Sequence, residues 1–198
     1  MQSKSASIIV LTGGTSARFG SDKSQALING KTLIARILES IPSEFEVIIV
    51  GQDPHIESSA YVCVQEEPLG GGPVAGFKAG LKICDSEIAL LIATDMPFAI
   101  AKVINLLNLM KSHDEALMYV DAEGFQQPLA GLYRVEAVER AFAAMGDVNG
   151  KSMRELVSQL TVVQIPATSE VADSLIDIDT AADLDRAIAY AAQFKDNL

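Results

Sequence analysis

Residues 7–34 read SIIVLTGGTSARFGSDKSQALINGKTLI and join a short apolar run to a loop rich in glycine and hydroxyl groups. The apolar part, IIVL, is typical of a buried strand, and Gly13 and Gly14 follow it closely. Backbone N–H groups of such a loop can surround a phosphate, and Arg18 and Lys23 add positive charge to the segment. The stretch therefore predicts a triphosphate site after the first strand, although a tight turn with two basic residues is the structural alternative.

Spacing excludes two common phosphate-binding motifs. The dinucleotide motif requires G-x-G-x-x-G, whereas the glycines here stand at positions 13, 14 and 20. The Walker motif requires G-x-x-x-x-G-K-[ST], but one residue too many separates Gly14 from Gly20, and Ser21 follows in place of Lys. The loop therefore belongs to neither class.

The size and charge of the chain limit the classes of protein to which it can belong. Its 198 residues, 49% of them hydrophobic, suit one compact domain over residues 1–198. The formal net charge of −11 argues against nucleic acid and anionic membranes as partners, because the overall field repels polyanions. With no signal peptide or long apolar segment in this sequence, we expect a cytoplasmic protein that holds its nucleotide in a local basic site.

Short apolar runs alternate with helix-like segments along the chain. Strands are expected at 7–11, 47–50, 61–64, 88–93, 116–120 and 162–165. Helices are expected near 32–40, 74–83, 101–111, 135–145, 152–160 and 181–194. This alternation predicts an α/β fold, a single-domain three-layer αβα sandwich around a mainly parallel sheet. Ligands of such sheets bind at the carboxyl ends of the strands, where each motif falls.

A second motif, EEPLGGGPVAGFKAGL, occupies residues 66–81. Its three consecutive glycines allow close approach to the backbone, and Pro73 suits the first turn of a helix. Gly76 and Gly80 lie one turn apart on that helix, where small residues admit a neighbouring element or a ligand. A flexible loop before a closely packed helix is the structural alternative.

A third motif, IALLIATDMPF, occupies residues 88–98 and places Asp95 just after a buried strand. A carboxylate at the mouth of a parallel sheet suits a magnesium ion, which proteins hold through one or two carboxylates together with phosphates. Capping of the next helix is the alternative role, and Asp95 lies early for it.

The first motif as a whole resembles the signature of the molybdenum cofactor guanylyltransferases, approximately L-x-G-G-x-S-x-R-M-G-x-D-K. Phe19 is the one departure from its fixed positions, standing where Met is usual. The following NGKTLI looks like the family's G-K-P-L-I segment, with Thr32 in place of Pro. The resemblance covers nearly the whole chain and implies a nucleotidyltransferase of Rossmann-like, glycosyltransferase-A-like fold.

The resemblance also implies which nucleotide is used. Gly14 and the segment Pro73–Gly76 favour GTP over CTP, because cytidylyl-transferring relatives usually differ at both places. Gln52 falls where the family often has Asn, and either Glu66 or Glu67 takes the place of an acidic residue. The nucleotide-binding residues implied are Leu11, Thr12, Gly13, Gly14, Lys23, Gln52, Glu66, Glu67, Pro73, Ala75, Gly76 and Asp95.

Catalytic roles follow from the same resemblance. Lys23 and Arg18 would stabilise charge on the transferring phosphoryl group and the departing pyrophosphate. The match of ATDMPF to the family's C-D-M-P-F makes Asp95 the ligand of the magnesium cofactor. Near the end, DIDTAADL resembles N-x-N-T-P-E-D-L, with Asp177 and Asp179 in place of the two Asn. Asp179 is then either a second metal ligand or, like Thr180, a helix cap.

Two later segments extend the match. Residues 121–130 resemble the family's turn followed by Q-P-L, although a plain hairpin connection explains them equally well. Lys151 and Arg154 stand at the start of a helix that could meet the phosphate of the second substrate. A solvated helix start is the alternative, and it is slightly favoured.

The resemblance implies transfer of GMP from GTP to the terminal phosphate of molybdopterin bearing molybdenum. Proteins that deliver the cofactor, and molybdoenzymes that accept it, are the protein partners that the resemblance suggests. One alternative is a cytidylyl- or other nucleotidyltransferase acting on molybdopterin or on a sugar or alcohol phosphate. The other alternative is a non-catalytic nucleotide-binding protein, against which the presence of Lys23 and Asp95 argues.

Overall fold

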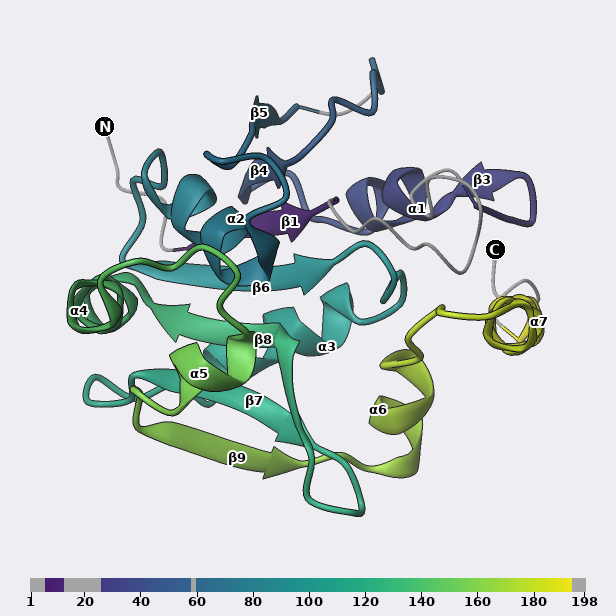
Figure 1. Cartoon of the computed structure of the whole chain (residues 1–198). Coiled ribbons are helices and arrows are strands. Elements are labelled where there is room, and N and C mark those ends of the chain that lie inside the picture. The colour runs from purple at the N-terminus through teal and green to yellow at the C-terminus, as the bar shows by residue number, and fades with distance from the viewer. Residues whose placement is uncertain (1–5, 13–25, 58–59, 194–198) are drawn as a thin grey trace.

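A seven-stranded β-sheet forms the centre of the computed structural model, which describes residues 6–12, 26–57 and 60–193 (Figure 1). The strands lie in the order β5-β4-β1-β6-β8-β7-β9. Their bounds are β1 (Ser7–Leu11), β4 (Glu46–Val50), β5 (Val62–Val64), β6 (Ile88–Ala93), β7 (Ala116–Val120), β8 (Gln126–Arg134) and β9 (Val162–Pro166). Strand β8 is antiparallel to both its neighbours, and the other described pairings of this sheet are parallel. The expected mainly parallel α/β sheet is confirmed.

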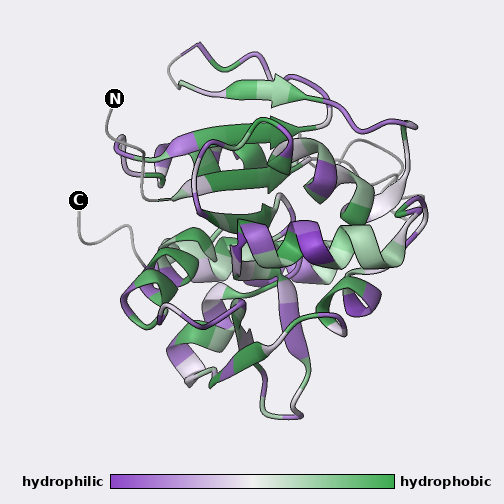
Figure 2. Cartoon of the chain, turned by 90° about the vertical axis from the view of Figure 1, so that its left-hand side faces the viewer, coloured by the Kyte–Doolittle hydropathy of each residue, from purple (hydrophilic) through white to green (hydrophobic). Residues whose placement is uncertain are grey.

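Helices cover both faces of the sheet and give the fold three layers. On one face lie α1 (Leu33–Glu39) and α3 (Ile100–Asn105). On the other lie α2 (Gly72–Leu81), α4 (Val135–Met145) and α5 (Met153–Val157). Figure 2 shows apolar strands at the centre, with hydrophilic residues gathered on helices and connections at the outside. The predicted αβα sandwich is confirmed.

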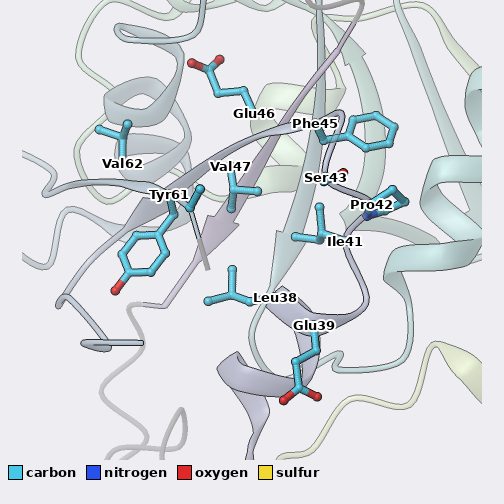
Figure 3. A pocket seen from close by; sticks show the side chains of 11 residues that line it. Leu38, Glu39, Ile41, Pro42, Ser43, Phe45, Glu46, Val47, Tyr61 and Val62 are labelled. Carbon is cyan, nitrogen blue, oxygen red and sulfur yellow. The ribbon is translucent and has the colours of Figure 1, made fainter. Parts of the chain in front are cut away.

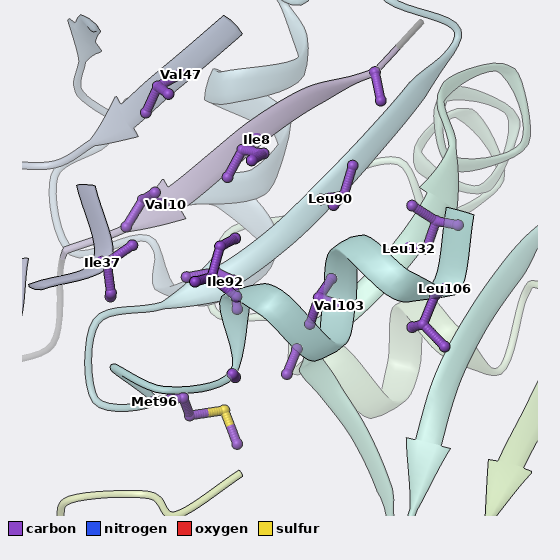
Figure 4. Close-up of a cluster of buried hydrophobic side chains, with 14 of the residues drawn as sticks. Ile8, Val10, Ile37, Val47, Leu90, Ile92, Met96, Val103, Leu106 and Leu132 are labelled. Atoms are coloured by element: carbon purple, nitrogen blue, oxygen red, sulfur yellow. The ribbon is translucent and has the colours of Figure 1, made fainter. Parts of the chain in front are cut away.

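The side chains of β1 explain why this strand lies in the middle of the sheet. Ile8, Ile9 and Val10 are each 0% exposed. Because side chains alternate across a strand, Ile8 and Val10 face the layer of α1 and α3 (Figure 4), whereas Ile9 and Leu11 face the layer of α2. A strand covered on both faces needs an apolar residue at every position. The run IIVL therefore places the end of β1 at the centre of the carboxyl edge.

A smaller cluster of elements lies beyond the carboxyl ends of the parallel strands (Figure 1). It combines the hairpin β2 (Leu27–Ile28) and β3 (Lys31–Thr32) with α7 (Ala181–Ala192), and α6 (Ser169–Ser174) leads into it. Its buried residues are Ile28, Leu33, Ile178, Ala187 and Ala191. The sequence analysis does not predict β2, β3 or α6, because elements this short carry no clear periodicity.

Several helices differ in length from the expected ranges. Helix α3 ends at Asn105 and continues as a 3₁₀ helix over Leu106–Asn108, so the expected helix to residue 111 is too long. Helix α5 likewise ends at Val157, short of residue 160, whereas α2 begins earlier than expected, at Gly72. Polar C-terminal turns commonly fray or tighten in this way. Among the described helices, none is both long and apolar enough to cross a membrane.

Helix α2 approaches the sheet most closely at Gly80. A Cβ atom added there would lie 2.8 Å from Cγ2 of Ile9 and 3.1 Å from Cγ2 of Val50. At Gly76, one turn earlier, the nearest atoms would be Cδ2 of Leu11 at 3.4 Å and Cγ1 of Val50 at 3.6 Å, which is ordinary contact. Gly80 therefore serves the packing of α2 against the strands.

Replacing Gly80 with Ala is expected to destabilise the protein relative to replacing Gly76 with Ala. Both changes gain about 1 kcal/mol of helix propensity. Only Gly80→Ala presses a methyl group against Ile9, and overpacking of a core costs ~1–3 kcal/mol. The free energies of unfolding in urea, measured without ligand, should therefore differ by about 1–3 kcal/mol in favour of Gly76→Ala. Equal values would contradict the close packing of α2.

Candidate functional site

Threonine hydroxyls hold together the carboxyl ends of three adjacent strands, β4, β1 and β6. The Thr12 backbone N–H and hydroxyl both donate to the carbonyl oxygen of Val50, at 2.9 and 3.0 Å. The Thr94 backbone N–H and hydroxyl both donate to the carbonyl oxygen of Leu11, at 3.1 and 3.2 Å. These bonds fix the carboxyl end of β1 between its two neighbours.

Three carboxylates lie together beside this point. Asp95 follows β6, and Asp177 and Asp179 come from the segment before α7; one ligand oxygen from each lies within 4.8 Å of the others. Asp95 is half-buried, whereas Asp177 and Asp179 are exposed. Such hard oxygen ligands suit a small divalent cation, since they repel one another without one. The donor set therefore fits the predicted magnesium site.

Ile178 explains how the last two carboxylates reach Asp95. Its side chain is 1% exposed and packs in the cluster formed by α7 and the β2–β3 hairpin. Its backbone N–H donates to the carbonyl oxygen of Asp95 at 3.0 Å. Burial of the middle residue of Asp177-Ile178-Asp179 holds its two neighbours beside the end of β6.

Other residues stand at the N-caps of the two helices that follow these carboxylates. Thr180 is the N-cap of α7 and forms a capping box with Asp183, so Asp179 lies outside the cap. Helix α3 begins after Ala99 with no side-chain cap, so Asp95 does not cap it either. The hydroxyl of Thr180, followed by the guanidinium of Arg186, lowers the pKa of Asp183 to about 2. Neither Asp179 nor Asp95 is therefore the N-cap of a described helix.

The glycine-rich loop before α2 is ordered by its own polar contacts. The Glu66 carboxylate accepts a hydrogen bond from the Gly70 N–H at 3.0 Å, while Glu67 is exposed. Gly72 has φ +86°, a conformation that side chains disfavour, and it opens α2. Which glutamate contacts a nucleotide stays a prediction, but Glu66 has a structural task already.

The other predicted nucleotide residues lie in two environments. Pro73 is exposed in the first turn of α2, whereas Ala75 and Gly76 are buried against the core. Gln52 is exposed just beyond β4, at the carboxyl edge. Their contacts with a nucleotide stay predictions. The remaining predicted residues, Gly13, Gly14, Arg18 and Lys23, lie outside the described residues.

Residues 8–163 match the family described as the MobA-like NTP transferase domain. The chain belongs to this family. A relative from Bacillus cereus (strain Q1), named probable molybdenum cofactor guanylyltransferase, is 28% identical over 182 residues, covering 87% of this chain and 90% of the relative. One of the same name from Bacillus anthracis is 27% identical over 181 residues, with the same coverage.

Solved structures agree with this family at the level of the fold. Molybdopterin-guanine dinucleotide biosynthesis protein A from Archaeoglobus fulgidus superposes with a TM-score of 0.71 at 22% identity, covering 94% of this chain and 99% of that one. The 2-C-methyl-D-erythritol 4-phosphate cytidylyltransferase from Thermus thermophilus gives 0.67 at 16% identity, covering 94% and 98%. The same architecture thus carries different nucleotidyl transfers.

Asp177, which lies after the matched residues 8–163, joins the carboxylate cluster without having been singled out from the sequence as a metal ligand. The alternation Asp-Ile-Asp carried a usable signal, because an extended segment with a buried middle residue turns its two neighbours to the same side. The sequence alone could not show that Asp177 lies near Asp95, since the two residues are far apart along the chain. The structure adds Asp177 to the predicted pair.

Side chains at the start of α5 bind to one another and to the backbone of its first turn. Ser152 and Glu155 form a capping box, and Lys151 pairs with Glu155 at 2.9 Å. The Ser152 backbone N–H, followed by Lys151, lowers the pKa of Glu155 to about 2. These contacts support the solvated helix start over a phosphate site, although Arg154 is exposed.

A pocket of about 730 Å³ lies between the end of α1 and the starts of β4 and β5 (Figure 3). Leu38, Ile41 and Tyr61 contribute apolar surface, and Glu39 and Glu46 contribute carboxylates. Its described lining holds no Lys or Arg. Because the lining is acidic and lies at the amino end of β4, this pocket does not suit a triphosphate.

Thr180→Ala and Asp179→Asn should separate capping from metal binding in the DIDT segment. Loss of the Thr180 hydroxyl removes the N-cap of α7 and should lower the free energy of unfolding by about 1 kcal/mol. Asp179→Asn leaves the capping box of Thr180 and Asp183 intact, so it should lower the metal-free stability less than Thr180→Ala does. Urea unfolding in EDTA measures both. A larger loss for Asp179→Asn would contradict this assignment.

Proposed function

We propose that this protein transfers GMP from GTP to the terminal phosphate of molybdopterin bearing molybdenum, releasing pyrophosphate. The observation that carries the proposal is the carboxylate cluster at the end of β6, beside the end of β1. The family match and the names of the relatives support the same chemistry. The substrates themselves rest on the resemblance and on those names.

The proposed reaction makes and breaks one bond each at phosphorus. An oxygen of the acceptor phosphate bonds to the α-phosphorus of GTP, and the bond from that phosphorus to the bridging oxygen of pyrophosphate breaks. The acceptor phosphate is already a nucleophile, so no Ser–His pair is needed. The chain's main tasks are alignment of the two substrates and neutralisation of charge.

The carboxylates Asp95, Asp177 and Asp179 are the residues that would hold a magnesium ion. When bound, the ion supplies charge neutralisation at the nucleotide phosphates. Two features of the chain set this geometry: the Ile178 N–H bond to Asp95, and the burial of Ile178. They hold the three carboxylates close together before any ligand arrives.

The other roles belong to the residues that the resemblance assigns. Gly13 and Gly14 present backbone N–H groups to the triphosphate, while Arg18 and Lys23 stabilise charge on the transferring phosphoryl group and on pyrophosphate. The segment Pro73–Gly76 contacts the guanine base. Pro73 is the exposed member of this segment, in the first turn of α2.

Thermal unfolding with each of GTP, CTP, ATP and UTP in the presence of magnesium tests the proposed substrate. At about a hundredfold excess over Kd, binding adds ~2.7 kcal/mol of stability. We expect a shift in Tm that is largest for GTP, needs magnesium and shrinks in Asp95→Asn. Asp85→Asn is the matched control, because Asp85 is exposed in the turn before β6, at the amino end of that strand.

The outcomes distinguish the alternatives. A shift largest for CTP would make the chain a cytidylyltransferase, and no shift with any nucleotide would contradict the nucleotide site. If GTP raises Tm but no pyrophosphate is released after molybdenum-loaded molybdopterin is added, the chain is a non-catalytic nucleotide-binding protein. Turnover that Asp95→Asn abolishes and Asp85→Asn preserves is the expected result.

Lys23→Ala is expected to lower kcat by about 10²-fold while raising the Kd for GTP less, because Lys23 acts on charge that develops in the transition state. Lys31→Ala is the matched control, since Lys31 is exposed and pairs with Glu39 at 2.6 Å. Pyrophosphate release at saturating GTP measures kcat, and calorimetry measures Kd. An unchanged kcat would remove this role from Lys23.

A further inference from the structure

The segment that joins α4 to α5, residues 146–152, contacts the loop before α2. The Gly150 N–H donates to the carbonyl oxygen of Gly71 at 2.8 Å. A Cβ atom added to Gly71 would lie 3.2 Å from Oδ1 of Asn149. A Cβ atom added to Gly72 would lie 3.7 Å from the carbonyl oxygen of Lys151. The contact thus falls at the start of α2, along which this connection runs in Figure 1.

The joining segment has supports of its own. Val148 and Met153, on either side of the contact, are buried in the same core cluster as the first turns of α2. The Asp147 carboxylate accepts a hydrogen bond from the Asn149 N–H at 2.9 Å. The α5 capping box then fixes the end of the segment. Because it is anchored in this way, the segment can hold the loop before α2 in place.

The contact is local. Next to it, a cavity of about 160 Å³ separates the segment from α2 and is lined by Ala75, Lys78 and Ala79 on one side and by Asp147 and Val148 on the other. Atoms that face such a gap lack packing partners there. The contact at Gly71 therefore acts together with the packing of Val148 and Met153 to position the first turn of α2 relative to this segment.

We propose that Asn149 and Gly150 are positioning residues for selection of the base. They fix the backbone of Gly71 and, through it, the first turn of α2, which contains Pro73. Gly71 is tightly enclosed, because a Cβ atom there would lie 2.8 Å from Cβ of Ala75 and 3.0 Å from the carbonyl oxygen of Pro68. The inference rests on the proposed function, in which residues 73–76 recognise guanine.

The chain offers a matched pair of glycines for the test. Gly150 has φ +70° and Gly146 has φ +69°, and a Cβ atom at either would meet nothing within 4 Å. Alanine at either site therefore strains the backbone without a clash. The two differ in their partner, because the Gly146 N–H donates to the carbonyl oxygen of Phe142 and not to Gly71.

The experiment compares the wild type with Gly150→Ala, Asn149→Ala and Gly146→Ala. Calorimetry with magnesium gives Kd for GTP and for CTP, and urea unfolding gives stability. We expect the preference for GTP over CTP to fall about tenfold or more in Gly150→Ala and Asn149→Ala, since displaced base-binding groups lose the hydrogen bonds that distinguish the two bases. Gly146→Ala should keep the preference of the wild type while losing similar stability to Gly150→Ala.

Three results would overturn the inference. An unchanged preference in both Gly150→Ala and Asn149→Ala would remove the positioning role and leave the proposed function intact. An equal fall in Gly146→Ala would assign the effect to general destabilisation. A wild type without preference for GTP would contradict the proposed function itself. Asn149→Ala keeps the test valid if Gly150→Ala does not fold, because it leaves the Gly150 backbone unstrained.

Discussion

The hydrogen bond from the Ile178 N–H to the carbonyl oxygen of Asp95 joins the C-terminal part of the chain to the end of a central strand. The candidate metal site depends on this bond, because Asp177 and Asp179 flank Ile178. Burial of the Ile178 side chain under α7 stabilises the same arrangement, so hydrophobic packing holds charged groups together. Isolated carboxylates would separate, since like charges at these distances repel.

The same packing links the site to the segment that follows the predicted phosphate loop. Ile28, in β2, and Leu33, the first residue of α1 after the hairpin, pack in the same cluster as Ile178. In the sequence, residues 13–25 stand between β1 and this hairpin.

Particular elements show how far the sequence could predict this structure. The strands at 7–11, 88–93 and 116–120 have the expected bounds, because each is an apolar run ended by polar or glycine residues and buried on both faces. Asp95 could be singled out for the same reason, as a carboxylate just past such a run, and it lies in the carboxylate cluster. Asp177 could not, since its role depends on a tertiary contact with a distant residue. The hydrogen bond between Gly150 and Gly71 could not be predicted from the sequence either, because the residues around each glycine are those of an ordinary turn.

The negative charge of this chain makes the binding of a triphosphate depend on cations close to the site. With a net charge of −11, the overall field opposes the approach of a triphosphate, and the three clustered aspartates oppose it further. Under the proposed function, Arg18, Lys23 and a divalent cation must offset both effects within a few ångströms. Asp177 and Asp179 stand where the resembling family has Asn, so this site carries more negative charge than that pattern implies. Neutral Asn side chains can lie beside phosphate oxygens without charge repulsion, whereas carboxylates beside phosphates need a cation between them, so under the proposed function triphosphate binding is tied more closely to metal binding.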